Sequence, residues 1–206
     1  MTFVPEPRRP NPLLRLGVWY AERTTGRRLL PARLLAHYPR AALSSAVLET
    51  LVAHHDGRLD ERLLQLVRLT VSLTSACAFC IDMNGADPER NRITDQELSA
   101  LRVLATGGDP GDPGWPATMT PPEVLAVRYA HSLSVTPPVP LAVIDEVTAE
   151  FSPREIVVLA TTAAQVGYWT RLIQGLGVPP AGFSDACRVP PVAPVPRGDQ
   201  GPPAGA

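Results

Sequence analysis

The chain has 206 residues, of which 45% are hydrophobic, and a formal net charge of −1. This length suits one domain with a sizeable core, and the near-zero charge provides no field that would gather nucleic acid or an acidic membrane. All basic residues are arginine, so a lysine Schiff base is excluded. No apolar run approaches the ~20 residues needed to cross a bilayer, and the start lacks the apolar stretch of a signal peptide. We therefore expect a cytoplasmic protein with no nucleic-acid or membrane partner.

Hydrophobic periodicity between the two ends is helical, and no convincing alternation of period two appears. The fold is predicted to be all-α. Asp60 and Thr94 are expected N-caps, the latter in a capping box with Glu97, and Ser75 could cap the helix that follows it. A long Gly/Pro loop at 107–116 suggests a lid or an edge excursion. The expected helices span residues 13–24, 31–37, 43–54, 61–74, 75–85, 95–105, 121–133, 140–151 and 154–175.

The two ends differ in composition from the predicted helical domain, residues 13–188. Residues 1–12 are rich in Pro and Arg and are expected to lie along the surface or to stay mobile. Residues 189–206 are dominated by Pro, Gly and Ala, cannot build a core and are predicted to be disordered. A Pro-rich tail can bind a partner, but a terminus without a role is the simpler interpretation.

Two apolar segments, residues 65–79 and 155–169, keep their aliphatic residues in register when they are aligned. The alignment places Gln65 opposite Glu155 and Phe79 opposite Trp169. This favours two related helical halves, with chance similarity between apolar helices as the alternative. Both helices are apolar on nearly every side, so we expect a subunit interface to cover part of them and the chain to form a homo-oligomer.

Cys77 and Cys80 form a C-x-x-C pair. On a helix these thiols lie about one turn apart, close enough for a disulfide that can be opened and reclosed. A zinc site would need two further ligands, and neither Cys187 nor the four histidines stand at ligand spacing near the pair. The pattern therefore favours thiol redox chemistry, with no metal and no cofactor.

Activation of the pair is the difficulty for catalysis. A free Cys has a pKa near ~8.5, and an exposed helix terminus contributes only ~0.3–1 kcal/mol, which is less than one pKa unit. A strongly activated thiol needs a further partner. Asn84 follows Cys80 by one turn and can donate a hydrogen bond, but it cannot relay protons. Asp82 is expected on another face of the helix.

Residues 60–85, with Leu66–Leu73 preceding Cys77-Ala78-Phe79-Cys80, resemble the carboxymuconolactone decarboxylase superfamily in its AhpD-like alkylhydroperoxidase branch. Further matching stretches are residues 123–130, 151–157 and 168–172, so the resemblance covers most of residues 40–180. It implies an all-helical AhpD-like domain in an oligomer. Its redox branch reduces hydroperoxides with a C-x-x-C pair.

The resemblance also implies roles for individual residues. The family pattern is a Glu, a C-x-x-C pair twelve residues later and a His four residues after the second Cys. It implies that Cys80 attacks the peroxide, that Cys77 resolves the product and that an external dithiol reductant regenerates the pair. The Glu and His form a proton relay in the family, but here Gln65 and Asn84 hold these positions, and amides cannot shuttle protons.

The expected function is therefore a thiol-dependent oxidoreductase that reduces hydroperoxides or exchanges disulfides, with activity weakened by the missing relay. A decarboxylase-like enzyme is one alternative, although that branch lacks the redox cysteines. A non-catalytic oligomeric relic of the family is another. Asp82 could serve as a different relay. Other residues that could line the pocket are Phe79, Glu155, Trp169 and Arg171.

Two of these residues carry open alternatives. As the aligned partner of Gln65, Glu155 could supply the missing carboxylate, although a solvated helix N-terminus is the simpler interpretation. Trp169 belongs more often to a core or an interface than to a site, but it could wall the thiol pocket. Arg171 could orient an acidic group of a neighbouring subunit.

Overall fold

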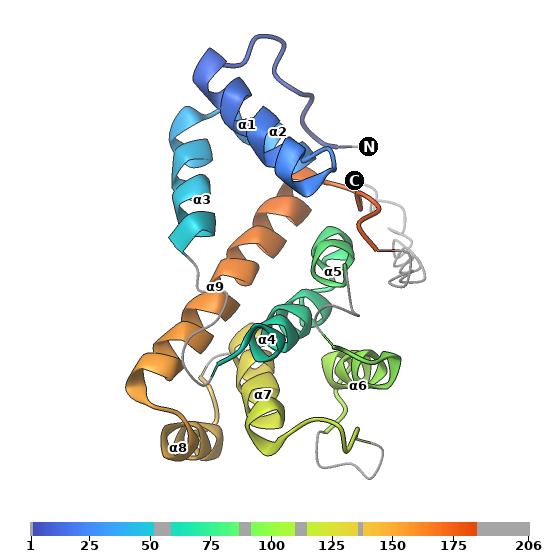
Figure 1. Cartoon of the computed structure of the whole chain (residues 1–206), viewed down its shortest axis with the longest axis vertical. Coiled ribbons are helices and arrows are strands. Elements are labelled where there is room, and N and C mark those ends of the chain that lie inside the picture. The colour runs from blue at the N-terminus through green and yellow to red at the C-terminus, as the bar shows by residue number, and fades with distance from the viewer. Residues whose placement is uncertain (1, 52–58, 87–91, 110–114, 136–137, 185–206) are drawn as a thin grey trace, which may run out of the picture.

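The structure is a computed structural model that describes residues 2–51, 59–86, 92–109, 115–135 and 138–184. Within these ranges the chain forms α-helices joined by loops and contains no β-sheet, which confirms the predicted all-α class (Figure 1). The helices are α1 (Pro12–Thr25), α2 (Leu30–Leu35), α3 (Pro39–Leu51), α4 (Glu61–Thr74), α5 (Ala78–Asn84), α6 (Asp95–Ala105), α7 (Pro121–Val135), α8 (Leu141–Glu150) and α9 (Pro153–Leu176).

Side-chain caps fix most of the helix starts. Asp60 accepts a hydrogen bond from the Leu63 amide at 2.9 Å, and Thr94 forms the predicted capping box with Glu97. The prediction for Ser75 was wrong, because Ser75 ends α4 rather than beginning α5. The predicted continuation of α3 beyond Leu51, the middle of the 107–116 loop and the Pro-rich tail lie outside the described residues.

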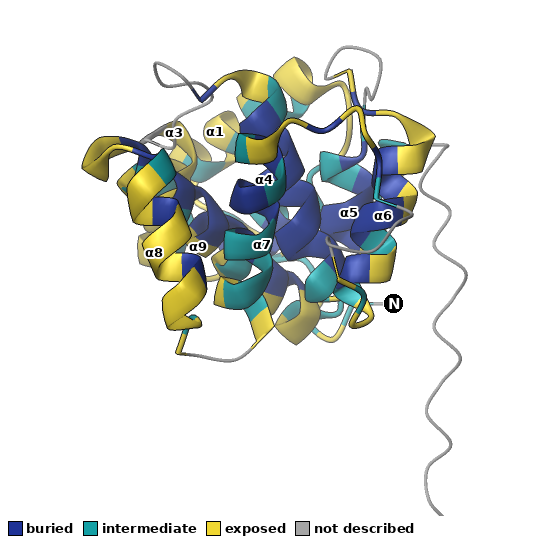
Figure 2. Cartoon of the chain, turned by 90° about the horizontal axis from the view of Figure 1, so that it is seen from below, coloured by how far each residue is buried: buried dark blue, intermediate teal, exposed yellow. Residues whose placement is uncertain are grey.

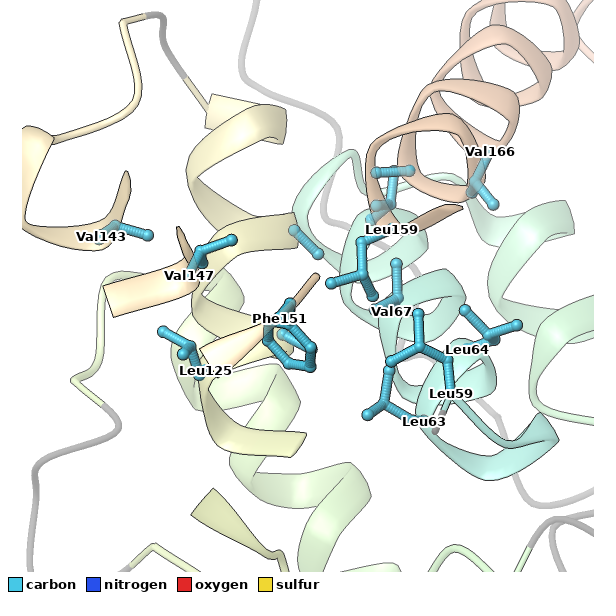
Figure 3. Close-up of a cluster of buried hydrophobic side chains, with 14 residues drawn as sticks. Leu59, Leu63, Leu64, Val67, Leu125, Val143, Val147, Phe151, Leu159 and Val166 are labelled. Carbon is cyan, nitrogen blue, oxygen red and sulfur yellow. The ribbon is translucent and has the colours of Figure 1, made fainter. Parts of the chain in front are cut away.

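Helix α4 is the centre of the core, with α7 and α9 packed against it (Figures 1 and 2). Eleven of its fourteen residues are buried within the single chain. Leu64 and Val67 of α4 meet Leu159 and Val166 of α9, and Phe151 joins them from the turn before α9 (Figure 3). The apolar surface of α4 is therefore covered within one chain, and the expected subunit interface stays a prediction for the other apolar helix, α9.

A buried ion cluster ties α4 to two further helices. Arg62 of α4 binds Glu97 of α6 at 2.7 Å and Glu123 of α7 at 2.7 Å. Burial alone would raise the pKa of Glu97, but hydrogen bonds from Arg62, the Thr94 amide and Thr118 lower that pKa to about 2. These contacts fix α6 and α7 on the α4 scaffold that carries the thiol helix.

Among the described helices, α9 alone is long and apolar enough to cross a membrane by length and composition. Its buried residues include Leu159, Val166 and Ile173, which pack into the core against α4, α5 and α7. This packing covers one face of α9, whereas 39% of its apolar stretch is buried in all and Val157 is 60% exposed.

The N-terminal segment before α1 is held by the rest of the chain. The Phe3 amide donates to the Leu176 carbonyl at 3.0 Å. Glu6 pairs with Arg28 and Arg33, and the His37 ring binds the Pro5 carbonyl at 2.7 Å. Of the two alternatives for residues 1–12, these contacts favour a segment that lies along the surface.

Helices α1 and α3 expose a set of large apolar side chains. No residue of α1 is buried, and its Leu13, Leu16 and Tyr20 share one face, with Leu13 79% exposed. On α3, Leu43 and Val47 lie one turn apart and are also exposed. Exposed apolar side chains that cluster on a surface favour an interaction site. It gives a basis for self-association on α1 and α3 rather than on α4.

Self-association is therefore expected to give a sedimenting particle well above the 22.1 kDa of one chain. Charges at exposed α1 positions, Leu16→Glu with Tyr20→Glu, should shift the particle toward one chain and leave that chain folded, because neither side chain is buried within it. Val103→Glu with Leu141→Glu adds the same two charges at exposed positions of α6 and α8 and serves as the control. A native protein that sediments only at ~22 kDa at micromolar concentration would contradict the prediction.

Candidate active site

The two thiols lie at the N-terminus of α5. After α4 the backbone turns at Ala76, whose φ is +48°, and the Cys77 amide donates to the Ser72 carbonyl at 3.1 Å. Cys77 is the N-cap residue of α5, where its Sγ accepts a hydrogen bond from the Cys80 amide at 3.4 Å. Both cysteines are in the free thiol form, and each is only 1% exposed.

The two thiols differ in how readily they ionise. The Cys80 S–H donates to Cys77 and lowers the pKa of Cys77 below its usual value; burial opposes this shift, while the Cys80 and Phe79 amides add to it. The same contact, together with burial, raises the pKa of Cys80 well above its usual range. Cys77 is therefore the first of the two thiols to ionise as the pH rises, and Cys80 keeps its proton to higher pH.

The surroundings of the thiols are apolar and come from distant parts of the chain. Leu34 of α2, Ile173 of α9 and Val178 pack with the two cysteines and Phe79 in one buried cluster. Among the predicted pocket residues, Phe79 belongs to this cluster and Trp169 packs against it. The structure thus brings both aromatic residues to the thiols.

Gln65 and Asn84, which hold the positions of the relay Glu and His in the family pattern, lie next to each other. The Gln65 Nε2 donates to the backbone carbonyl of Asn84, and the Asn84 Nδ2 donates to the Ser72 hydroxyl at 3.0 Å. Ser72 in turn donates to the Arg68 carbonyl at 2.8 Å. This network is hydrogen-bonded and uncharged at both positions, so it can fix α5 against α4 but cannot move a proton at neutral pH.

The two candidate carboxylates, Asp82 and Glu155, are both engaged in contacts away from the thiols. Asp82 accepts three backbone hydrogen bonds, from Ala181, Gly182 and Ser184, which occupy both carboxylate oxygens. Glu155 forms a capping box with Ser152 at the start of α9, about 27 Å along the axis from Ile173 at ~1.5 Å per residue. Glu155 is therefore too far from the thiols to replace the relay carboxylate.

Arg171 is exposed on α9. Its predicted contact with a neighbouring subunit lies beyond a single chain and stays a prediction.

A polar cluster beside the thiol site was missed from sequence. Glu49 of α3 accepts hydrogen bonds from Gln165 at 2.7 Å and from the Trp169 indole at 2.9 Å. Burial lowers the pKa of the Arg68 guanidinium, and the carboxylates of Glu49 and Glu61 oppose that shift. One residue in the sequence could have pointed to this cluster: Arg68 is a charged residue inside an apolar helix, so a partner carboxylate was to be expected near it.

Within the described residues, neither a metal site nor the cavity beside α1 and α2 involves the two thiols. No group of three or more His, Cys, Asp or Glu side chains in the described ranges is arranged to hold a metal ion. A cavity of about 350 Å³ lies between the N-terminal segment, α1 and α2, where Trp19, Glu22 and Arg33 line it. Neither cysteine lines this cavity.

The region around the thiols is similar to a known protein family. Residues 41–119, from α3 past the thiol helix, match the model of the Carboxymuconolactone decarboxylase family. No curated protein sequence matches the chain.

Several solved structures share the fold. An uncharacterised peroxidase-related protein from Ralstonia eutropha JMP134, with an alkylhydroperoxidase AhpD core, is 15% identical over 87% of this chain and 92% of its own, with a TM-score of 0.66. ATU0492 from Agrobacterium tumefaciens, a candidate antioxidant defence protein AhpD, is 21% identical over 75% and 97%, with a TM-score of 0.59.

The debrominase Bmp8 is a third neighbour, in the form of a cysteine-to-alanine variant in complex with 2,3,4-tribromopyrrole. It is 15% identical over 85% of this chain and 87% of its own, with a TM-score of 0.64. At these identities the likeness establishes the fold. Residues 41–119 are thus similar to the Carboxymuconolactone decarboxylase family, and the chain shares the fold of AhpD-like proteins.

Proposed function

We propose that the protein is a thiol-dependent oxidoreductase that reduces a hydroperoxide, or exchanges a disulfide, at Cys77 and Cys80. The observation that carries the proposal is the buried, reduced thiol pair at the start of α5, in which Cys77 ionises more readily than Cys80. A buried dithiol with a stabilised thiolate is poised for oxidation.

The chemistry can proceed without the Glu and His of the family. Cys80 gives its proton to the Cys77 thiolate and attacks the terminal peroxide oxygen, so that an S–O bond forms and the O–O bond breaks. The leaving alkoxide takes the proton from Cys77 and departs as the alcohol. The Cys77 thiolate then attacks the Cys80 sulfenic acid, forms the disulfide and releases hydroxide. The pair loses two electrons, and the peroxide gains them.

In this scheme Cys77 acts first as the base and then as the resolving thiol. It reconciles two features of the site, since the family resemblance assigns the attack to Cys80 while the N-cap geometry favours charge on Cys77. Gln65 and Asn84 position α5 through hydrogen bonds and take no part in proton transfer.

The proposal includes partners. An external dithiol reduces the Cys77–Cys80 disulfide by exchange and becomes a disulfide itself, which completes the cycle. We place the protein in the cytoplasm, where such dithiols are kept reduced. The working form is proposed to be a homo-oligomer assembled through α1 and α3.

Counting thiols before and after a stoichiometric dose of hydroperoxide tests the proposal. We expect the folded protein to lose two thiols rapidly, and mass spectrometry to find them in one Cys77–Cys80 disulfide that dithiothreitol reopens. Since Cys187 supplies a third thiol, the Cys187→Ser variant provides the matched background. Inert Cys77 and Cys80 in the folded protein would favour the non-catalytic relic instead.

Reductive dehalogenation of an apolar aromatic compound is a second candidate. It is favoured by the aromatic residues around the thiols, Phe79, Trp169 and Phe183, and by the fold shared with a debrominase. In the balanced reaction two thiols become a disulfide while an aryl bromide becomes the arene, bromide and a proton. Release of bromide from a bromopyrrole, with loss of two thiols, would distinguish it. Decarboxylation would give the buried thiols no role.

A further inference from the structure

Both reactive sulfurs are closed off from solvent in this structure. Cys77 and Cys80 are each 1% exposed, while any oxidant must touch a sulfur atom to react. Some of the surrounding cluster must therefore move before the site can act.

The covering elements differ in how firmly they are held. Leu34 and Ile173 belong to the helices α2 and α9 and are almost fully buried. Val178, Ala181 and Phe183 instead belong to residues 177–184, a non-helical segment that follows α9 and that we call the strap. Ala181 and Phe183 are only partly buried. Displacing the strap would uncover the thiols without breaking a helix of the core.

The strap is joined to the thiol helix by a compact set of contacts. Asp82 accepts hydrogen bonds from the Ala181 and Gly182 amides at 2.8 Å each and from the Ser184 amide at 2.9 Å. Phe183 packs edge-to-face on Phe79, with ring centroids 6.1 Å apart. Phe79 lies in the sequence between the two cysteines, and Asp82 follows Cys80 by two residues. The start of the strap is held to α9, where the Val178 amide donates to the Ile173 carbonyl at 3.1 Å, whereas residues 181–184 are held by the same short helix that carries the thiols.

The backbone of the strap has glycines at both of its turning points. Gly177 ends α9 with φ +64°, and Gly182 at the Asp82 contact has φ +75°. Both values lie in the left-handed region that side chains other than glycine rarely adopt. The docked conformation therefore requires glycine at both positions, and the hydrogen bonds of Gly177 and Val178 to α9 leave residues 179–184 as the part that can swing.

We propose that the strap controls access to the Cys77–Cys80 pair and that Asp82 is its latch. When the three amides leave Asp82, the strap swings away from Phe79 and exposes the thiols; when they return, the pair is sealed. Asp82 is a positioning residue that acts through the strap, not a proton relay. This inference deepens the proposed function, on which its biological meaning rests, but the gate itself concerns thiol access alone.

Alkylation of the reduced full-length protein by iodoacetamide tests the gate, in the Cys187→Ser background so that only the pair reports. Asp82→Asn replaces an acceptor oxygen with an N–H donor that faces backbone amides, and it is expected to raise the alkylation rate about tenfold or more, because the rate follows the population of the open form. Hydrogen exchange at residues 181–184 should accelerate by a similar factor. Asp145→Asn, at an exposed site on α8, should leave both rates unchanged.

Gly182→Ala provides a second variant that leaves Asp82 intact. A Cβ at this position meets nothing within 4 Å, but the positive φ disfavours alanine, so the strap should open without a steric clash. Faster alkylation in both variants, with unchanged urea unfolding of the core, supports the gate. If both variants fold and alkylate at the native rate, or if alkylation rises only in step with global unfolding, the gate is overturned. An open strap over thiols inert to peroxide would overturn the proposed function and leave the gate standing.

Discussion

Replacing Cys80 by serine is expected to abolish hydroperoxide reduction, because the attacking sulfur is lost. Replacing Cys77 by serine is expected to stop the reaction after one turnover, with a sulfenic acid or a mixed disulfide trapped on Cys80. If Cys77 is also the base, this first turnover should itself be slower by about 10²–10⁴-fold. Rapid-mixing kinetics followed by mass spectrometry measure both the rate and the trapped species.

The pH dependence of Cys77 alkylation tests whether the Cys80 thiol makes Cys77 easier to ionise. The Cys80 S–H lowers the pKa of Cys77, so the native thiolate persists to lower pH than a free thiol would. Cys80→Ala removes this donor, and the pH at which Cys77 alkylation is half-maximal should rise. Cys187→Ser leaves the pair intact and should keep the native profile. Native-like activity in Cys80→Ser, or an unchanged alkylation profile in Cys80→Ala, would exclude the scheme.

Much of the fold could be predicted because its helix starts use standard polar caps. Asp60 and Thr94 begin α4 and α6 as expected, since their side chains satisfy free amides at the helix ends. The start of α5 was missed for a physical reason. Ser75 has a typical capping side chain, but α4 continues to Thr74 and Ser75 ends it. The backbone then turns at Ala76, whose φ is positive, so the residue that caps α5 is Cys77, through its thiol.

The candidate site could be predicted where sequence spacing fixes geometry. One helical turn separates Cys80 from Asn84, and the packing of α5 on α4 brings Asn84 to Gln65. Contacts between distant segments carried no such signal. Asp82 is held by backbone amides of the strap, and a backbone amide has no residue type to recognise in a sequence. Glu49 likewise reaches Trp169 from a helix far away in the chain.

Restoring the family pair is expected to accelerate peroxide reduction. Gln65→Glu together with Asn84→His should raise the rate by about 10²–10⁴-fold, the usual contribution of a positioned acid or base. The introduced imidazole should also add a pH dependence near neutrality. The two changes should be non-additive, because a relay needs both members and the two positions are in contact.

The single variants show why the pair must be changed together. Gln65 is buried and donates to the Asn84 carbonyl, so Gln65→Glu alone sets a carboxylate against a buried acceptor. The new acid relieves this repulsion only by keeping its proton, which raises its pKa in the folded protein, so the melting temperature should fall as the pH rises above the ordinary carboxyl range of ~4.3 and through the raised pKa. Asn84→His alone can keep the contact to the Ser72 hydroxyl through a ring N–H and should fold normally. All four proteins belong in one peroxide assay with melting temperatures alongside. If the native protein already matches the double variant, the shared proton of Cys77 and Cys80 is sufficient and the amides at positions 65 and 84 impose no kinetic penalty.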